Sequence, residues 1–365
     1  MYSEEDINSA VASGALSIEA AESFRTHMSK RRELPRSSEE NFRLINSFND
    51  IFVSIGVVIL LLAAGAIGQS IGSSFSSAEP ALMAGAGLLV ALTAWPLTEF
   101  FTRKRRMALP SIILLLAFVG GVFLTIFGLG VALVENGDSR TGAFMVSVAG
   151  LVAAGSAYIH WKRFMVPITV AAGAAAVAAT AIALLAAIID PDLMDGNMGL
   201  TFVFIAGLIV FAFAMRWDMS DRARTTRRSD VAFWLHLLAA PMIAHPVFAA
   251  MGVSDGSNIG IAAAGAVIAV YIVFGLIALA VDRRALLVSA LAYVLIALTF
   301  LFREFGAVEL NFALTALVIG SALLSLSAFW QPIRKTVISA LPQDIRDKLP
   351  PTEDQGAIAA QPAAT

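Results

Sequence analysis

Ten continuous apolar stretches, each close to 20 residues long, constrain the fold of this chain more than any other feature. An α-helix needs about 20 apolar residues to cross the roughly 30 Å hydrocarbon core of a bilayer. A transmembrane β-strand would instead alternate polar and apolar side chains over about ten residues. The pattern therefore predicts an all-α, polytopic transmembrane helix bundle with spans near residues 51–69, 81–101, 111–134, 142–160, 166–189, 198–215, 231–251, 259–281, 285–302 and 309–329.

The composition agrees with a membrane protein and excludes some chemistry. Hydrophobic residues make up 58% of the chain and charged residues 14%, against about 45–50% and about 25% in ordinary soluble domains. A lipid environment accommodates this excess of apolar surface, and the bilayer is the one partner that composition alone predicts. The chain has no cysteine, so disulfides, thiolate nucleophiles and cysteine-ligated metals are excluded.

The loop charges predict an orientation. Of the 25 Lys and Arg residues, all but Arg140 and Arg303 lie in the N-terminal region, in the loops after the second, fourth, sixth and eighth spans, or in the C-terminal tail. Positive residues accumulate on the cytoplasmic side of short loops. Both termini are therefore predicted to be cytoplasmic. This rule also explains the basic loops 103–106 and 222–228, so no nucleic-acid partner is predicted.

The same residues suggest where the protein resides. Arginine outnumbers lysine 20 to 5, and alanine and glycine are abundant, which is typical of a GC-rich bacterial genome. Acidic residues stand at positions 4–6, where a cleavable signal peptide would carry basic ones. We expect the first span to direct insertion into the bacterial cytoplasmic (inner) membrane.

Residues 1–46 are predicted to form a small cytoplasmic helical hairpin and linker. Ser3 would cap a helix that runs to about Ala12, Gly14 would break it, and Ser17 would cap a second helix from Ile18 to about Arg32. It has too few apolar residues to form a core that would keep the hairpin folded by itself. We expect the hairpin to pack on the membrane domain or on a cytoplasmic protein partner.

The other predicted segments are the ten-span transmembrane domain at 47–330, an interfacial amphipathic tail at 331–350 and a disordered tail at 351–365. In the amphipathic tail, apolar residues recur every fourth position, which is typical of a helix lying on lipid headgroups. They are Ile333, Val337, Leu341, Ile345 and Leu349.

The hairpin sequence carries a family resemblance. Residues 11–21 read Val-Ala-Ser-Gly-Ala-Leu-Ser-Ile-Glu-Ala-Ala, followed by a polar linker and a long multi-span region. This arrangement resembles a family of predicted bacterial integral membrane proteins that is classed as a domain of unknown function. The resemblance implies a similar layout and brings no activity with it.

Small residues are dense in two spans. The third span contains Gly120, Gly121, Gly128 and Gly130, and the fifth has a run of alanines around Gly173. Small side chains let membrane helices approach closely. We therefore expect both spans to be central rather than lipid-facing, with a glycine-lined solute path as the alternative to tight packing. Ten spans also permit two inverted sets of five, although the halves show no similarity at the residue level.

The seventh span holds the most unusual candidate residues. It contains Trp234, His236, Pro241 and His245. Proline removes a backbone hydrogen bond, and freed carbonyls near a kink can bind a solute. The histidines are nine residues apart, which places them on opposite faces of a regular helix. They form either a proton-titrating or solute-binding pair, or neutral histidines bonded to carbonyls of neighbouring helices.

Acidic candidates are few. Glu99 lies near the cytoplasmic end of the second span, where it pairs with Arg103 four residues on, or else faces inward toward Asp230 and His236. The sequence has no phosphate-binding glycine loop, no G-x-S-x-G, no H-E-x-x-H and no dense acidic or histidine cluster. No cofactor and no metal site is therefore predicted.

Three functions stay open on this evidence. The first and favoured one is a small-solute transporter or permease that uses the kinked histidine helix. The second is a membrane-embedded enzyme acting on a lipid-linked substrate, which requires His236, Asp230 and Glu99 to converge. The third is a non-catalytic membrane component that binds a partner through residues 1–46.

Overall fold

The computed structural model describes residues 7, 10–14, 16–24, 48–134, 137–222, 224, 226–253, 260–305 and 310–351. Within these residues it is helical, without strands, and ten helices are long and apolar enough to cross a membrane. This confirms the predicted all-α multi-pass bundle. The ten are α3 (Phe48–Phe75), α4 (Glu79–Thr98, continued by the π-helix η1, Glu99–Lys104), α5 (Ala108–Ala132), α6 (Ser139–Phe164), α7 (Ile168–Ile189), α8 (Gly196–Ser220), α9 (Arg227–Ala250), α10 (Ile261–Val281), α11 (Ala285–Glu304) and α12 (Asn311–Ala328).

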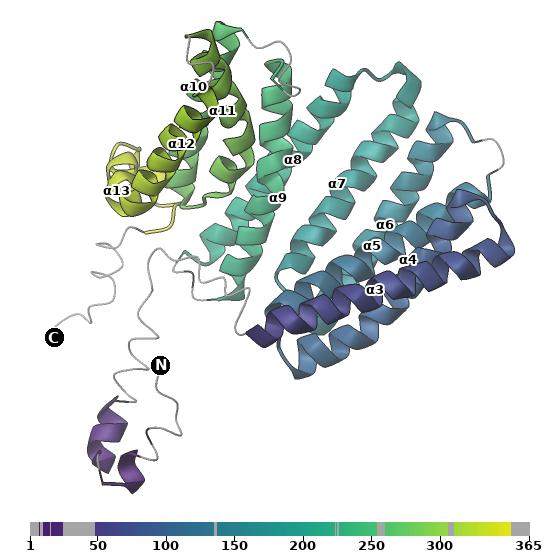
Figure 1. The fold of residues 1–365 in the computed structure, drawn as a ribbon, viewed down its shortest axis with the longest axis horizontal. Helices are drawn as coiled ribbons and strands as arrows, with labels where there is room; N and C mark the ends of the chain where they lie inside the picture. Colours follow the sequence, from purple (N-terminus) through teal and green to yellow (C-terminus); the bar gives the residue numbers. More distant parts are fainter. Residues whose placement is uncertain are drawn as a thin grey trace.

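The helices form two sets of five that meet along α7, α8 and α9 (Figure 1). In the first set, α3 to α7, consecutive helices pack on one another. In the second set, α8 packs on α9, but α9 then packs on α11, while α10 and α12 flank α11. The order of neighbours therefore differs between the sets. Helices α4, α6, α8, α10 and α12 end at one face of the bundle, which we call the basic end. The basic residues of this face include Arg103–Arg106, Lys162, Arg163, Arg222 and Arg224.

Glycines allow the first set to pack closely. A Cβ atom on Gly121 would lie 2.7 Å from the carbonyl oxygen of Gly87 in α4, and one on Gly128 would lie 2.5 Å from that of Pro80. Gly68 of α3 and Gly85 of α4 face each other in the same way. The glycine-rich α5 thus lies at the centre of the first set, in contact with α3, α4, α6 and α7, as predicted.

The alanine-rich α7 differs from the prediction. It packs along α6 and touches α9, but its buried residues are only Ile168, Thr169, Ala171 and Ala183. The span is central in position, because it lies where the two helix sets meet, but few of its side chains are fully buried. Small side chains let α7 approach α6 along one side, but they do not surround the helix with other helices.

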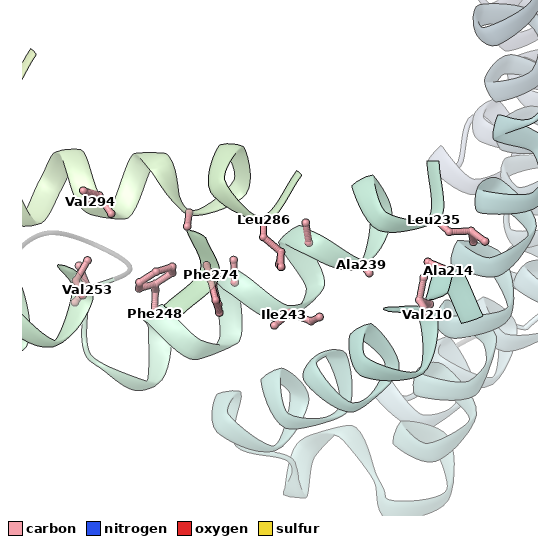
Figure 2. Packing of buried hydrophobic residues seen from close by; sticks show 14 of the residues in the cluster. Val210, Ala214, Leu235, Ala239, Ile243, Phe248, Val253, Phe274, Leu286 and Val294 are labelled. Carbon is pink, nitrogen blue, oxygen red and sulfur yellow. The ribbon is translucent and has the colours of Figure 1, made fainter. Parts of the chain in front are cut away.

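α9 is the most enclosed span. In its most apolar 18-residue stretch 56% of the residues are buried, against 11–33% in the other nine spans. Its buried face joins residues of α8, α10 and α11 in one apolar core (Figure 2). Phe248 of this core stacks on Tyr293 of α11, with ring centroids 4.5 Å apart. The helix that carries both candidate histidines is therefore the structural centre of the second set.

The described part of the N-terminal region has the local structure that the sequence predicts. Residues 10–12 are helical, Gly14 has a positive φ of 74°, and residues 18–24 form a second helix. The Ser17 hydroxyl accepts a hydrogen bond of 3.1 Å from the Ala20 amide, which caps this helix. Figure 1 shows these short helices apart from the transmembrane helices. The predicted Ser3 cap, the helix end at Arg32 and the tail 352–365 lie outside the described residues.

The C-terminal segment folds back onto the basic end. It comprises α13 (Trp330–Ser339) and α14 (Gln343–Arg346). The face of α13 that packs on the protein carries Trp330, Arg334 and Ile338, all buried. In the predicted apolar stripe, Ile333 and Ile345 are exposed. Leu349 of the same stripe is buried and Val337 packs on the cluster around Trp330, so the stripe is divided between the docked face and the exposed face.

Candidate functional site

The most enclosed ionisable group of the second set is Asp218, near the end of α8. Its carboxylate oxygen Oδ2 lies 2.8 Å from Nε2 of His236, and both side chains are buried. A carboxylate only accepts hydrogen bonds, so His236 Nε2 carries the hydrogen. The bond joins α8 to α9 one third of the way along the histidine helix. Phe211 packs edge-on against the imidazole at 5.1 Å between ring centroids.

Arg283 supplies the balancing charge. Its guanidinium donates to Asp218 Oδ1 at 2.7 Å and to Oδ2 at 3.4 Å. It also donates to the Ser229 carbonyl oxygen at 3.1 Å. Arg283 is 4% exposed and lies in the short connection between α10 and α11. We call Asp218, His236 and Arg283 the buried cluster.

The chemistry of the buried cluster follows from its charges. One carboxylate and one guanidinium neutralise each other, and the imidazole adds a hydrogen-bond donor beside them. Charges inside a membrane protein are expensive unless they pair, and they mark solute or proton pathways in many proteins. The cluster offers a donor, an acceptor and a titratable ring within hydrogen-bond distance of one another. That set can bind a small polar or ionic solute, or hold a proton.

A second group of charges adjoins the buried cluster through the chain itself. Asp282, next to Arg283, accepts hydrogen bonds from Arg224 at 2.8 Å and from Nε1 of Trp330 at 2.7 Å. Arg334 lies 3.7 Å from the same carboxylate. Burial lowers the pKa of the Arg224 and Arg334 guanidinium groups, and the Asp282 carboxylate opposes that shift.

The two predicted histidines have separate surroundings. His236 is buried beside Asp218, whereas His245 is exposed and its Nδ1 lies 2.6 Å from the Tyr293 hydroxyl of α11. Both partners are side chains rather than the backbone carbonyls that one hypothesis expected. Pro241 is exposed on the same side of α9 as His245. The nine-residue spacing thus places the imidazoles on different faces, as the helical period predicts.

The remaining predicted residues do not converge on His236. Glu99 pairs with Arg103 at 3.3 Å, as predicted for a local pair, and with Arg163 of α6 at 2.7 Å. Asp230 lies half-buried in the first turn of α9. Trp234 packs against apolar residues of both helix sets. His236, Asp230 and Glu99 therefore do not form the convergent set that the enzyme hypothesis requires. The acid beside His236 is Asp218.

A third histidine is more deeply buried than the sequence suggests. His160, near the end of α6, is fully buried. Its Nδ1 lies 3.3 Å from the Thr169 hydroxyl, and Nε2 has no hydrogen-bond partner in the structure. The rings of Trp95, Phe118 and Phe164 surround it at centroid distances of 4.6–6.3 Å.

Sequence analysis missed Asp218 and Arg283 because both lie outside the predicted apolar stretches. α8 continues to Ser220, five residues beyond its predicted end at 215. A partial signal was available: Asp282 is a lone acid beside two arginines, and Asp218 is one of three acids within a strongly basic loop. An acid in that setting is a candidate for a buried ion pair. Among the described residues, no three His, Asp or Glu side chains group closely enough to hold a metal ion.

Comparison with known proteins adds no family. No protein-family model matches the chain, no curated protein matches it, and no solved structure matches its fold. The resemblance seen in residues 11–21 therefore remains a prediction. Ten apolar helices identify the chain as a multi-pass membrane protein in contact with a lipid bilayer.

Proposed function

We propose that this protein is a small-solute transporter of the bacterial inner membrane, and that the buried cluster is its solute- or proton-binding site. One observation carries the proposal. Three ionisable side chains from α8, α9 and the α10–α11 connection are buried together, with Asp218 2% exposed. A membrane protein that only needed packing could use apolar residues here at lower cost.

The position of the cluster supports this function. α8 and α9 lie between the first helix set and the rest of the second set (Figure 1). Transporters commonly bind their solutes where two groups of helices meet and rock against each other. The two prolines inside α9, Pro241 and Pro246, are points at which this helix can bend.

The other predicted residues have roles within this proposal. His245 with Tyr293 forms a second polar point on α9, beyond Pro241 and away from the basic end. Trp234 contacts both helix sets and lies two residues from His236. Glu99 and Asp230 lie toward the basic end, which we propose is cytoplasmic because of the positive-inside rule.

A flux assay tests the proposal. Purified protein is reconstituted into liposomes that contain a pH-sensitive dye, and amino acids, organic acids, sugars, amines and inorganic ions are presented in turn. We expect at least one class to produce flux above that of empty liposomes, and His236→Gln to change its pH dependence. If no class produces flux, and none shifts the melting temperature of the protein, the transporter proposal fails.

A second candidate function rests on the N-terminal hairpin. Two apolar side chains of its described part, Ile18 and Phe24, are 69% and 39% exposed, and the hairpin lies apart from the transmembrane helices. So small a unit has little core of its own, and a partner that covers these side chains would stabilise it. We propose that residues 1–46 recruit a cytoplasmic protein. The test compares proteins that co-purify with the full chain and with a variant lacking residues 1–46; identical sets would exclude this role.

A further inference from the structure

The C-terminal segment 330–351 is joined to the basic end by buried polar bonds. Trp330 donates through Nε1 to Asp282 at 2.7 Å, and its ring lies 4.7 Å from the Arg284 guanidinium. Arg222, which follows α8, donates to the Leu349 carbonyl oxygen at 3.1 Å. The segment thus contacts both the α10–α11 connection and the end of α8, the two places that supply Arg283 and Asp218.

Arg334 closes the segment on itself. Its guanidinium donates to the Pro350 carbonyl oxygen at 2.6 Å and to that of Pro351 at 3.3 Å, while facing Asp282 at 3.7 Å. The side chain is 1% exposed. An arginine buried this deeply is stabilised only while those acceptors remain in place. When the segment leaves the basic end, Arg334 keeps its two bonds within the segment and loses the facing Asp282 carboxylate.

The chain connects these bonds directly to the buried cluster. Asp282 binds the C-terminal segment, and the next residue, Arg283, binds Asp218. Arg224 adds bonds to the carbonyl oxygens of Val281 and Asp282, at 3.1 and 3.3 Å. A displacement of the Asp282 backbone must also move Arg283, because the two share a peptide unit.

We propose that residues 330–351 act as a latch, whose docking on Asp282 holds Arg283 against Asp218 and whose release loosens the buried cluster. The latch is a conformational device at the same site as the proposed function. It would let the basic end control access to Asp218 and His236. The segment is held by a small apolar contact around Trp330 and by a few polar bonds. It suits such a role because those bonds can be exchanged for water at the membrane surface.

Hydrogen exchange measured by mass spectrometry tests the latch in the full-length protein. Trp330→Phe keeps a ring at this position but removes the hydrogen bond to Asp282. We expect amide exchange to rise about tenfold in residues 278–286 and 215–221, as the loss of a hydrogen bond to a charged group predicts. Exchange in α5 should stay unchanged. Gln343→Ala, at an exposed position of α14, is the matched control and should leave all three regions unchanged.

Two results would overturn the latch. In the first, exchange rises in residues 330–351 alone, which means that the segment docks without affecting the cluster. In the second, Trp330→Phe changes nothing anywhere. Arg334→Lys provides a second variant, because it keeps the charge but cannot reach both proline carbonyls with one planar group; it should reproduce the Trp330→Phe pattern. Exchange needs no solute, so the latch can hold even if the chain transports nothing.

Discussion

At the scale of single residues, Asp218 places a buried carboxylate between α8, α9 and the α10–α11 connection. It receives one hydrogen bond from His236 and two from Arg283 while being 2% exposed. The attraction of its partners roughly offsets the hydration free energy that a buried carboxylate loses, so the intact cluster adds little to the free energy of unfolding. Removing one member lowers the stability strongly, because the remaining charged groups then stay buried without a partner of opposite charge.

Asp218→Asn is expected to destabilise the protein strongly. The variant leaves the Arg283 charge buried opposite a neutral amide, which typically costs ~3–5 kcal/mol. Thermal unfolding in detergent, followed by tryptophan fluorescence, would show a clear fall in the melting temperature. A melting temperature equal to that of the wild type would show that Arg283 does not depend on this carboxylate.

His160→Leu is expected to leave the stability of the protein unchanged or to raise it. The His160 Nε2 atom is buried without a partner, and a buried unsatisfied polar atom costs about 1–3 kcal/mol. Leucine removes that cost and leaves only the Thr169 hydroxyl without its bond. The melting temperature should stay within a few degrees of the wild type or rise. A fall as large as that of Asp218→Asn would show that His160 has a polar partner of its own.

These residues also show what a sequence can predict at this scale. His236 was identifiable because an imidazole within an apolar stretch is rare. Its partner was not, because Asp218 lies beyond the apolar stretch and looks like an ordinary loop charge. The separations of 18 residues to His236 and 65 to Arg283 have no local pattern. Only the packing of α8 against α9 and the path of the α10–α11 connection bring them together.

At the scale of elements, contact between α4 and α5 depends on glycines at particular helical positions. Gly121 faces the backbone of α4, whereas its neighbour Gly120 has no atom within 4 Å of the position a Cβ would occupy. Sequence analysis expected the whole glycine group to pack. The structure separates its members, because one residue along a helix turns the side chain by about 100°.

Gly121→Ala and Gly120→Ala form a matched pair that tests this contact. The first should destabilise the protein by about 1–3 kcal/mol, since the new Cβ meets backbone atoms that cannot move without separating the helices. The second should be neutral or slightly stabilising, because alanine favours helix more than glycine does. Thermal unfolding of both variants measures the difference. Equal effects would contradict the close approach of α4 and α5.

At the scale of the whole molecule, most of the fold was predictable and its arrangement was not. All ten spans appear where apolar runs near 20 residues predict them. A continuous apolar run inside a bilayer must satisfy its own backbone hydrogen bonds, and the α-helix is almost the only structure that does so. The order of neighbours in the second set, with α9 packed on α11 rather than on α10, has no counterpart in those runs. It depends on side chains such as Phe248 and Tyr293 that interlock across helices.

The orientation is a prediction at this scale, and the absence of native cysteine makes it easy to test. Lys104→Cys places one thiol at the basic end, and Asp192→Cys places one at the opposite end. In intact cells of a bacterial host, a membrane-impermeant maleimide added outside should label only the Asp192→Cys variant, as the positive-inside rule predicts. Labelling of Lys104→Cys alone would reverse the orientation.

The central claim is that the buried cluster, rather than any surface ion pair, carries the function of the protein. The most direct measurement compares solute flux into liposomes for the wild type, Asp218→Asn and Asp190→Asn, each corrected for reconstituted amount. Asp190 pairs with Arg140 at 3.0 Å in a half-exposed position at the opposite end, so it is the control. The account predicts that Asp218→Asn falls to the level of empty liposomes while Asp190→Asn keeps the wild-type flux. Wild-type flux in a folded Asp218→Asn protein would contradict it.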